Sequence, residues 1–186
     1  ALILVFALGI QFGKRSAQLP EAPEGGAPAA AAPFAGGAAT GTPPDISNMS
    51  PRERFDRLFD RVMRSASSGD MNSVQTFAPM ALQAYAMLDT VDADARFDAA
   101  TIDLHIGDVA GATALADTLV KEHPAHLFGW MLKATVARFQ QDTAATRAAT
   151  AQFTRHYEAE MKARRPEYTT HQQAIATFRR QAGLAP

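Results

Sequence analysis

From about residue 49 onward, apolar residues recur at intervals of three and four, the spacing that places side chains on one face of a helix. The first run consists of Phe55, Leu58, Phe59, Val62 and Met63. Ser50 precedes it as a candidate cap, Pro51 suits the first helical position, and Glu53 completes a capping box. The pattern therefore predicts a helix that begins at Pro51.

The rest of the chain repeats this pattern in runs that end at glycine, aspartate or proline. Further helices are expected at about 72–88, 109–123, 125–140, 143–165 and 170–183. One more helix should run from a cap at Asp92 or Asp94 to residue 106. Pro79 predicts a kink or a late start in the second helix, and Pro166 is expected to stop the sixth. Thr170 and Gln173 predict a capping box for the last. Alanine is abundant and β-branched residues rarely follow one another, so we expect an all-α fold.

Three dipeptides, Gly69-Asp70, Gly107-Asp108 and Gln141-Asp142, each separate two expected helices. They lie 38 and 34 residues apart, and the second spacing is the period of a tetratricopeptide repeat. When residues 93–126 are aligned with 127–160, the chain resembles that family at its turn glycine, small alanines, aromatic and packing positions and terminal proline. These residues are Gly107, Ala112, Ala116, Leu119, Pro124, Trp130, Ala134 and Phe153.

The chain departs from the family pattern in three places. The unit at 51–90 has a second helix about four residues too long, Thr146 and Thr150 replace alanines, and Asp103 replaces the usual tyrosine. The resemblance implies a short right-handed helical-hairpin solenoid of about three repeats over residues 50–165. Residues 169–183 are then a C-terminal capping helix, and the whole domain covers 49–186.

The resemblance also implies a concave groove, lined by the first helix of each repeat, that binds extended peptides or partner helices. The positions that match are Phe97, Thr101, Leu104, Met131, Thr135 and Arg138. Some of these residues, Leu104 in particular, are alternatively part of the core between repeats. The lysine and asparagine clamp with which some family members bind a terminal carboxylate is absent here, so we do not expect a receptor for chaperone tails.

Residues 1–13 are apolar except for Gln11, and Lys14 and Arg15 follow directly. The run is shorter than the ~20 residues that cross a bilayer. A buried helix and a signal-peptide core fit the length too, but a signal peptide carries its basic residues before the apolar run. We expect residues 1–15 to be the C-terminal part of a membrane anchor that begins before Ala1, with Lys14 and Arg15 at the membrane interface. The orientation of the anchor in the membrane depends on comparing the basic residues on its two flanks, and the flank before Ala1 is not in the sequence. The periplasmic side is slightly favoured for the soluble domain.

Residues 16–48 are rich in alanine, proline and glycine and cannot bury enough apolar surface to fold alone. We interpret them as a linker that lies along a partner or reaches over it, to a distance on the order of 90 Å when extended. The anchor and the linker together indicate a membrane protein whose soluble domain lies outside the bilayer.

Charge excludes one class of partner. The chain has 18 basic and 19 acidic residues, so it lacks the basic excess typical of nucleic-acid binding. It contains no cysteine, which excludes disulfides, thiol catalysis and cysteine metal sites.

The sequence contains no catalytic motif: no phosphate-binding glycine loop, nucleophile elbow or dinucleotide fingerprint is present. His123 and His126 lie near a helix boundary without further ligands close by in the sequence, so we expect no metal site there. Asp92, Asp94 and Asp98 lack the glycine and glutamate of a calcium loop and are interpreted as helix caps. We therefore expect no enzyme activity, cofactor or small-molecule substrate.

These expectations combine into a membrane-anchored, non-catalytic scaffold subunit. Its helical domain would dock on a multi-subunit membrane complex, of the respiratory, photosynthetic or envelope-assembly kind. The alternative is a transient assembly factor or peptide-binding chaperone that uses the concave groove. An enzyme that uses His123 and His126 ranks far below both.

Overall fold

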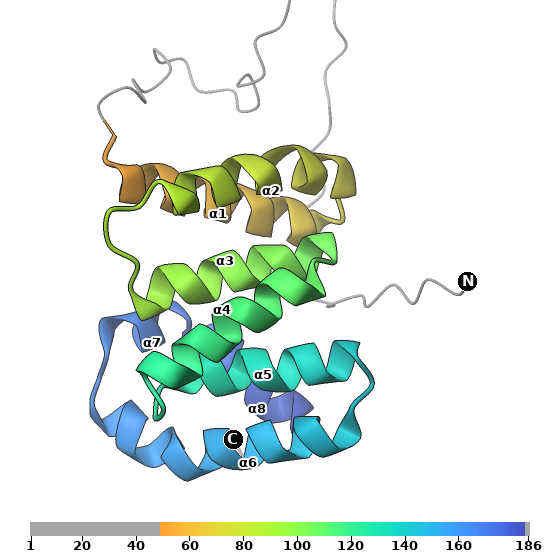
Figure 1. Cartoon of the computed structure of the whole chain (residues 1–186), viewed down its shortest axis with the longest axis vertical. Coiled ribbons are helices and arrows are strands. Elements are labelled where there is room, and N and C mark those ends of the chain that lie inside the picture. Colours follow the sequence, from red (N-terminus) through yellow and green to blue (C-terminus); the bar gives the residue numbers. More distant parts are fainter. Residues whose placement is uncertain (1–48, 185–186) are drawn as a thin grey trace, which may run out of the picture. The chain divides into compact units, whose positions relative to one another are not determined.

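The computed structural model describes residues 49–184, which are all-α as predicted (Figure 1). These residues form eight helices and no strand. They are α1 (Pro51–Ser68), α2 (Met71–Ala86), α3 (Ala93–Ile106), α4 (Val109–Glu122), α5 (Leu127–Phe139), α6 (Thr143–Lys162), α7 (Pro166–Thr170) and α8 (Gln172–Gln181).

Short polar side chains start most of these helices. The Ser50 hydroxyl accepts the Glu53 amide hydrogen at 3.2 Å, and Glu53 accepts the Ser50 amide hydrogen at 2.8 Å, so the predicted capping box is confirmed. An aspartate caps four later helices, and each accepts a backbone hydrogen bond from the residue three positions on. These caps are Asp70, Asp92, Asp108 and Asp142.

The first six helices form three consecutive hairpins, α1–α2, α3–α4 and α5–α6 (Figure 1). Helix α3 packs against both helices of the first hairpin, and α5 packs against both helices of the second. The turns within the hairpins lie at one edge of the stack, on the right in Figure 1. The hairpin order is the one expected of a helical repeat, while the right-handed solenoid geometry and the family stay predictions.

Helix α3 contributes to two hydrophobic clusters. Ala95, Ala99 and Ile102 pack with α1 and α2, whereas Phe97 and Ala100 pack with α4, α5, α6 and the C-terminal helices. The alanines at the small positions of the repeat, Ala112, Ala116 and Ala134, are fully buried. Small side chains let neighbouring helices approach closely, which explains why the alanine-rich chain forms a packed stack.

The C-terminal end differs from the prediction. Pro166 begins α7 rather than simply ending α6, because proline suits the first position of a helix. The predicted capping box of Thr170 and Gln173 is wrong: the Thr170 hydroxyl donates to the Pro166 carbonyl at 3.4 Å, and α8 begins without a side-chain cap. The single capping helix predicted for residues 169–183 is thus two helices that meet at His171.

Other helix ends move by one to three residues. Pro79 lies inside α2, which starts at Met71 and not late. Helix α5 starts at Leu127 because the side chain of His126 caps it. Helix α6 ends at Lys162, and Arg164 then has a positive φ of 52°, which reverses the chain before α7.

Several predictions concern residues outside the described range. The membrane anchor at 1–15, with Lys14 and Arg15, and the linker at 16–48 lie there. None of the helices found within residues 49–184 is both long and apolar enough to cross a membrane.

Candidate functional site

Three of the predicted partner-binding residues belong to α3, and one of them, Phe97, packs against the chain's own C-terminal segment. Phe97 is only 7% exposed, stacks on Phe128 with ring centroids 4.2 Å apart, and meets the edge of His171 at 5.1 Å. Thr101 is half-buried, and its hydroxyl donates to the Phe97 carbonyl at 2.8 Å. Leu104 is half-buried and packs against the core. Their role in partner binding stays a prediction.

The predicted residues on α5 are also engaged within the domain. Met131 is 5% exposed and belongs to the same hydrophobic cluster as Phe97. The half-buried Thr135 donates its hydroxyl to the Met131 carbonyl at 2.8 Å. Arg138 lies 5.1 Å from the ring centroid of Phe178 and donates to Gln181 at 3.1 Å, so α8 covers it. Partner binding by these three residues likewise stays a prediction.

His171, at the junction of α7 and α8, is the residue that joins the C-terminal segment to the stack. Its ring packs edge-on against Phe59 of α1, Phe97 of α3 and Phe128 of α5, at centroid distances of 6.4, 5.1 and 5.2 Å. Three aromatic side chains from three hairpins therefore fix the orientation of one imidazole.

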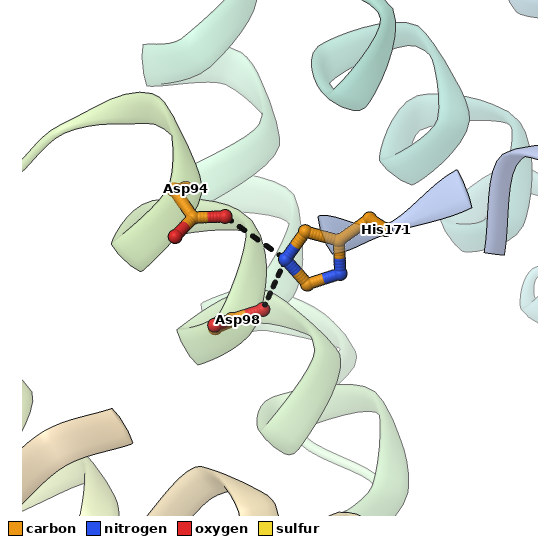
Figure 2. A group of neighbouring side chains, drawn as sticks. All are labelled: Asp94, Asp98 and His171. Atoms are coloured by element: carbon orange, nitrogen blue, oxygen red, sulfur yellow. Dashed lines mark hydrogen bonds and ion pairs between the residues drawn. The ribbon is translucent and has the colours of Figure 1, made fainter. Parts of the chain in front are cut away.

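That orientation directs Nε2 of His171 at two carboxylates of α3, as Figure 2 shows. Asp94 and Asp98 lie one turn apart on the helix, so both project toward the same ring. Nε2 is 2.9 Å from Oδ1 of Asp94 and 3.4 Å from Oδ1 of Asp98. Among the described residues, this is the one group of three potential metal ligands whose ligand atoms all lie within 4.8 Å of one another.

The two carboxylates have opposite electrostatic environments. Burial, together with the negative charges of Asp94 and Asp56, raises the pKa of Asp98 to about 9. Burial also opposes ionisation of Asp94, but hydrogen bonds and charge from His171 and Arg52 outweigh it and lower the pKa of Asp94. Asp98 is 4% exposed, and its buried Oδ1 accepts no hydrogen bond.

Arg52 of α1 neutralises part of the charge around this group. Its guanidinium contacts Asp56 at 2.7 Å, Asp92 at 2.7 Å and Oδ2 of Asp94 at 2.6 Å. The contact with Asp94 leaves Oδ1, the atom nearest His171, on the other side of the carboxylate. Arg52 therefore holds the Asp94 side chain in position without occupying the side that faces His171.

A second feature is a groove between α5, α6 and α8, with a volume of about 700 Å³, which we call the basic groove because of its arginines. Three arginines and three threonines line it, together with Gln181 and apolar residues, and no acidic side chain of the described residues does. The arginines are Arg138, Arg147 and Arg155, and the threonines are Thr146, Thr150 and Thr154. Nη2 of Arg138 is buried without a hydrogen-bond partner in the described part of the chain. Burial lowers the pKa of Arg138.

Two of the groove threonines follow from the alignment of the two units. Thr146 and Thr150 stand where the unit at 93–126 has Ala112 and Ala116, and both line the groove. Phe178 of α8 packs on Phe153 in the middle of α6, with ring centroids 4.7 Å apart. The residues of α6 from Thr146 to Arg155 that line the groove lie on both sides of this contact in the sequence.

Of the two histidines considered from sequence, His126 has a structural role. Its Nδ1 accepts the Phe128 amide hydrogen at 3.3 Å, so Nε2 carries the hydrogen and donates to Glu167 at 3.2 Å. His123 is exposed, with its ring centroid 6.3 Å from that of His126. These contacts make His126 a cap of α5 and a link to α7.

From the sequence, Arg138 is predicted to bind a partner, which stays a prediction, while the other groove arginines and His171 are not named. Arg147 and Arg155 are eight residues apart on one helix face, a visible signal, but the sequence does not say which face α8 leaves open. Asp94 and Asp98 form a visible i,i+4 pair, but their partner His171 is 77 residues from Asp94. No local pattern could have brought it to them.

Comparison of the chain with protein-family models, with curated protein sequences and with solved structures returns no match in any of the three. The resemblance to tetratricopeptide repeats therefore rests on the residues named above.

Proposed function

We propose that this protein is a non-catalytic scaffold subunit whose helical domain docks on a multi-subunit membrane complex by binding an acidic segment of a partner. The observation that carries the proposal is the basic groove between α5, α6 and α8. The candidate complexes are respiratory, photosynthetic or concerned with envelope assembly.

The charge of the groove favours an acidic occupant. Arg147 and Arg155 are exposed at its wall, and no carboxylate of the described residues lines it. Arg138 has a buried N–H group without an acceptor, and a carboxylate of a partner would supply one. Two of the threonine hydroxyls already donate within α6, Thr146 to the Asp142 carbonyl and Thr154 to the Thr150 carbonyl. Their oxygens can still accept hydrogen bonds from the backbone amides of an extended peptide.

The N-terminal part of the chain supports a membrane location for this docking. The apolar run at 1–13 and the basic pair Lys14 and Arg15 have the composition of an anchor, and residues 16–48 have that of a spacer. Tethering a weak docking groove to the membrane of its partner raises the local concentration of both, so modest affinity for the acidic segment is enough.

The alternative is a transient assembly factor or peptide-binding chaperone. It would use the same groove, but the partner would exchange rapidly rather than remain as a stoichiometric subunit. A stack of short hairpins whose C-terminal face binds peptide is compatible with either role, and the lifetime of the complex distinguishes them.

The test uses the full chain, expressed with a tag in its own host and extracted from membranes with a mild detergent. We expect a complex of fixed stoichiometry on size-exclusion chromatography. The double charge reversal R147E/R155E should leave the chain in the membrane fraction and weaken its association with the complex tenfold or more. The matched control is R57E/R64E, which reverses two exposed arginines of α1.

A direct measurement separates the groove from the rest of the chain. A labelled peptide of about ten glutamates should bind the full chain in detergent, with affinity that falls as salt rises, and the same length of glutamine should not. Equal loss of the complex in both double variants, or a wild-type chain that elutes as a monodisperse free monomer, would refute the proposal.

A further inference from the structure

The three side chains drawn in Figure 2 have the geometry of a metal site, and this location is independent of the basic groove. Asp94 and Asp98 present carboxylate oxygens from consecutive turns of α3. His171 presents Nε2 from the α7–α8 junction, at 2.9 and 3.4 Å from these oxygens. With metal–ligand bonds of about 2.0–2.2 Å, two ligands of one ion lie about 2.9 Å apart at a right angle and about 3.5 Å apart at the tetrahedral angle. Both measured distances fall close to this range.

One buried oxygen of the group lacks a hydrogen bond. Oδ1 of Asp98, on a side chain that is only 6% exposed, has the 3.4 Å contact with Nε2 of His171 but accepts no hydrogen bond. Buried carboxylate oxygens are almost always hydrogen-bonded or bound to a cation. A cation between Asp98 and His171 would satisfy this atom.

The surrounding charges favour a cation over an additional anion. Four carboxylates, at Asp56, Asp92, Asp94 and Asp98, lie around the single guanidinium of Arg52, and the negative charge of Asp60 also acts on Asp98. Asp56, Asp92 and Asp94 already outnumber the guanidinium of Arg52, so the group has an excess of negative charge even while Asp98 is protonated. A divalent ion would offset most of this excess, and Arg52 would remain on the far oxygen of Asp94.

The chemical types of the three ligands limit which metal ion would bind. We propose that Asp94, Asp98 and His171 bind a divalent transition-metal ion, Zn²⁺ being the best match to one imidazole and two carboxylates, with a fourth position open to water or a partner group. Ca²⁺ and Mg²⁺ prefer sites made only of oxygen and would bind less well. In binding, Nε2 of His171 supplies its lone pair and Asp98 binds as a carboxylate, so the proton of the Asp98 carboxyl group, and any proton on this nitrogen, is released to solvent.

The consequence of binding is structural. The ion would connect α3 to the α7–α8 junction, 77 residues apart in the chain, and so hold the C-terminal segment over Phe97 and Phe128. The three phenylalanines around His171 already orient the ring, and this preorganisation should favour binding because little freedom is lost.

The test uses the full chain in detergent after treatment with a chelator, with Zn²⁺ added alone and measured by isothermal titration calorimetry. We expect one equivalent to bind. D98N and H171Q, the first of which is close to isosteric, should each weaken binding tenfold or more. H123Q is the matched control, because His123 is an exposed histidine outside the group, and it should bind as the wild type does.

Hydrogen exchange provides a readout that does not depend on the variants folding equally well. Zn²⁺ should slow amide exchange in α7 and the start of α8 of the wild-type chain, whereas Ca²⁺ at the same concentration should not. The proposal is overturned if the wild type shows no saturable binding, if D98N and H171Q bind like the wild type, or if H123Q alone abolishes binding.

Discussion

Tyr168 of α7 donates its phenolic hydrogen to Glu160 of α6 at 2.7 Å, in the interior of the domain. The same phenolic oxygen accepts the Leu127 amide hydrogen, at the start of α5, at 3.0 Å. Arg165 adds a hydrogen bond to the same carboxylate oxygen of Glu160 at 2.8 Å. One buried hydroxyl thus joins α5, α6 and α7, and it fixes where the C-terminal segment begins.

The first prediction is that Y168F destabilises the domain. The ring of Phe would still pack on Phe128, but the Leu127 amide would lose its acceptor and Glu160 one of its donors. We expect the free energy of unfolding, from urea denaturation of the full chain in detergent, to fall by about 1–3 kcal/mol. Y157F is the control: its hydroxyl accepts from Arg179 in a less buried place, and the loss should be below about 0.5 kcal/mol. Equal losses would contradict the assignment.

The second prediction concerns how the stability of the domain changes at low pH. Burial alone would raise the pKa of Glu160, but hydrogen bonds from Tyr168 and Arg165 outweigh it and lower the pKa. A carboxylate with a lowered pKa in the folded state stabilises that state above its ordinary pKa, and the contribution is lost as pH falls through the folded value. E160Q should therefore cost about 1–2 kcal/mol near neutral pH, and progressively less as the pH falls below the ordinary glutamate pKa of 4.5. E158Q, an exposed change on the same helix, should leave the pH dependence of urea unfolding as it is in the wild type.

Local sequence signals predicted the helices well because their causes are local. The capping box of Ser50 and Glu53 and the cap at Asp92 each need only residues within one turn. The buried alanines followed from the repeat, since Ala112, Ala116 and Ala134 occupy its small positions. The all-α fold class could therefore be predicted from the sequence alone.

The helix boundaries of the C-terminal segment could not be predicted in this way, because they depend on contacts with residues far away in the sequence. The boundary between α7 and α8 falls at His171, whose ring is held by Phe59, Phe97 and Phe128. A capping box at Thr170 is locally reasonable, but these contacts place the helix start elsewhere. The candidate sites depend on the same packing. The sequence predicts partner binding by Arg138 and a capping role for Asp98, but it does not predict that α8 lies beside the first or that His171 lies beside the second.

The third prediction tests the close approach of α4 and α5. Alanine favours a helix over glycine by about 1 kcal/mol, yet a Cβ at Gly129 would lie 2.9 Å from Cγ2 and 3.3 Å from the backbone nitrogen of Val120. G129A should therefore destabilise the domain, by about 1–2 kcal/mol in urea unfolding. The double variant G129A/V120A removes the nearer contact and should be more stable than the sum of the single changes predicts, by about 1 kcal/mol. Strict additivity would show that the helices do not touch here.

The last prediction concerns Asp103, where the repeat pattern has a tyrosine. Asp103 is 5% exposed, and burial together with the charge of Asp108 raises its pKa to about 6. The sign is opposite to that of Glu160: a carboxyl group with a raised pKa favours the folded state while it is protonated, and this contribution is lost as pH rises from about 4 through about 6. D103N keeps the shape and cannot ionise, so it should be more stable than the wild type near neutral pH by about 1–3 kcal/mol. The stabilities of D103N and the wild type in urea unfolding should converge near pH ~4, because the wild-type carboxyl group is then protonated in the folded state.

D89N, at an exposed aspartate, is the control and should leave stability unchanged within about 0.5 kcal/mol. If D103N is the less stable protein near neutral pH, the ionised carboxylate must have a favourable partner, and the burial argument for this position fails.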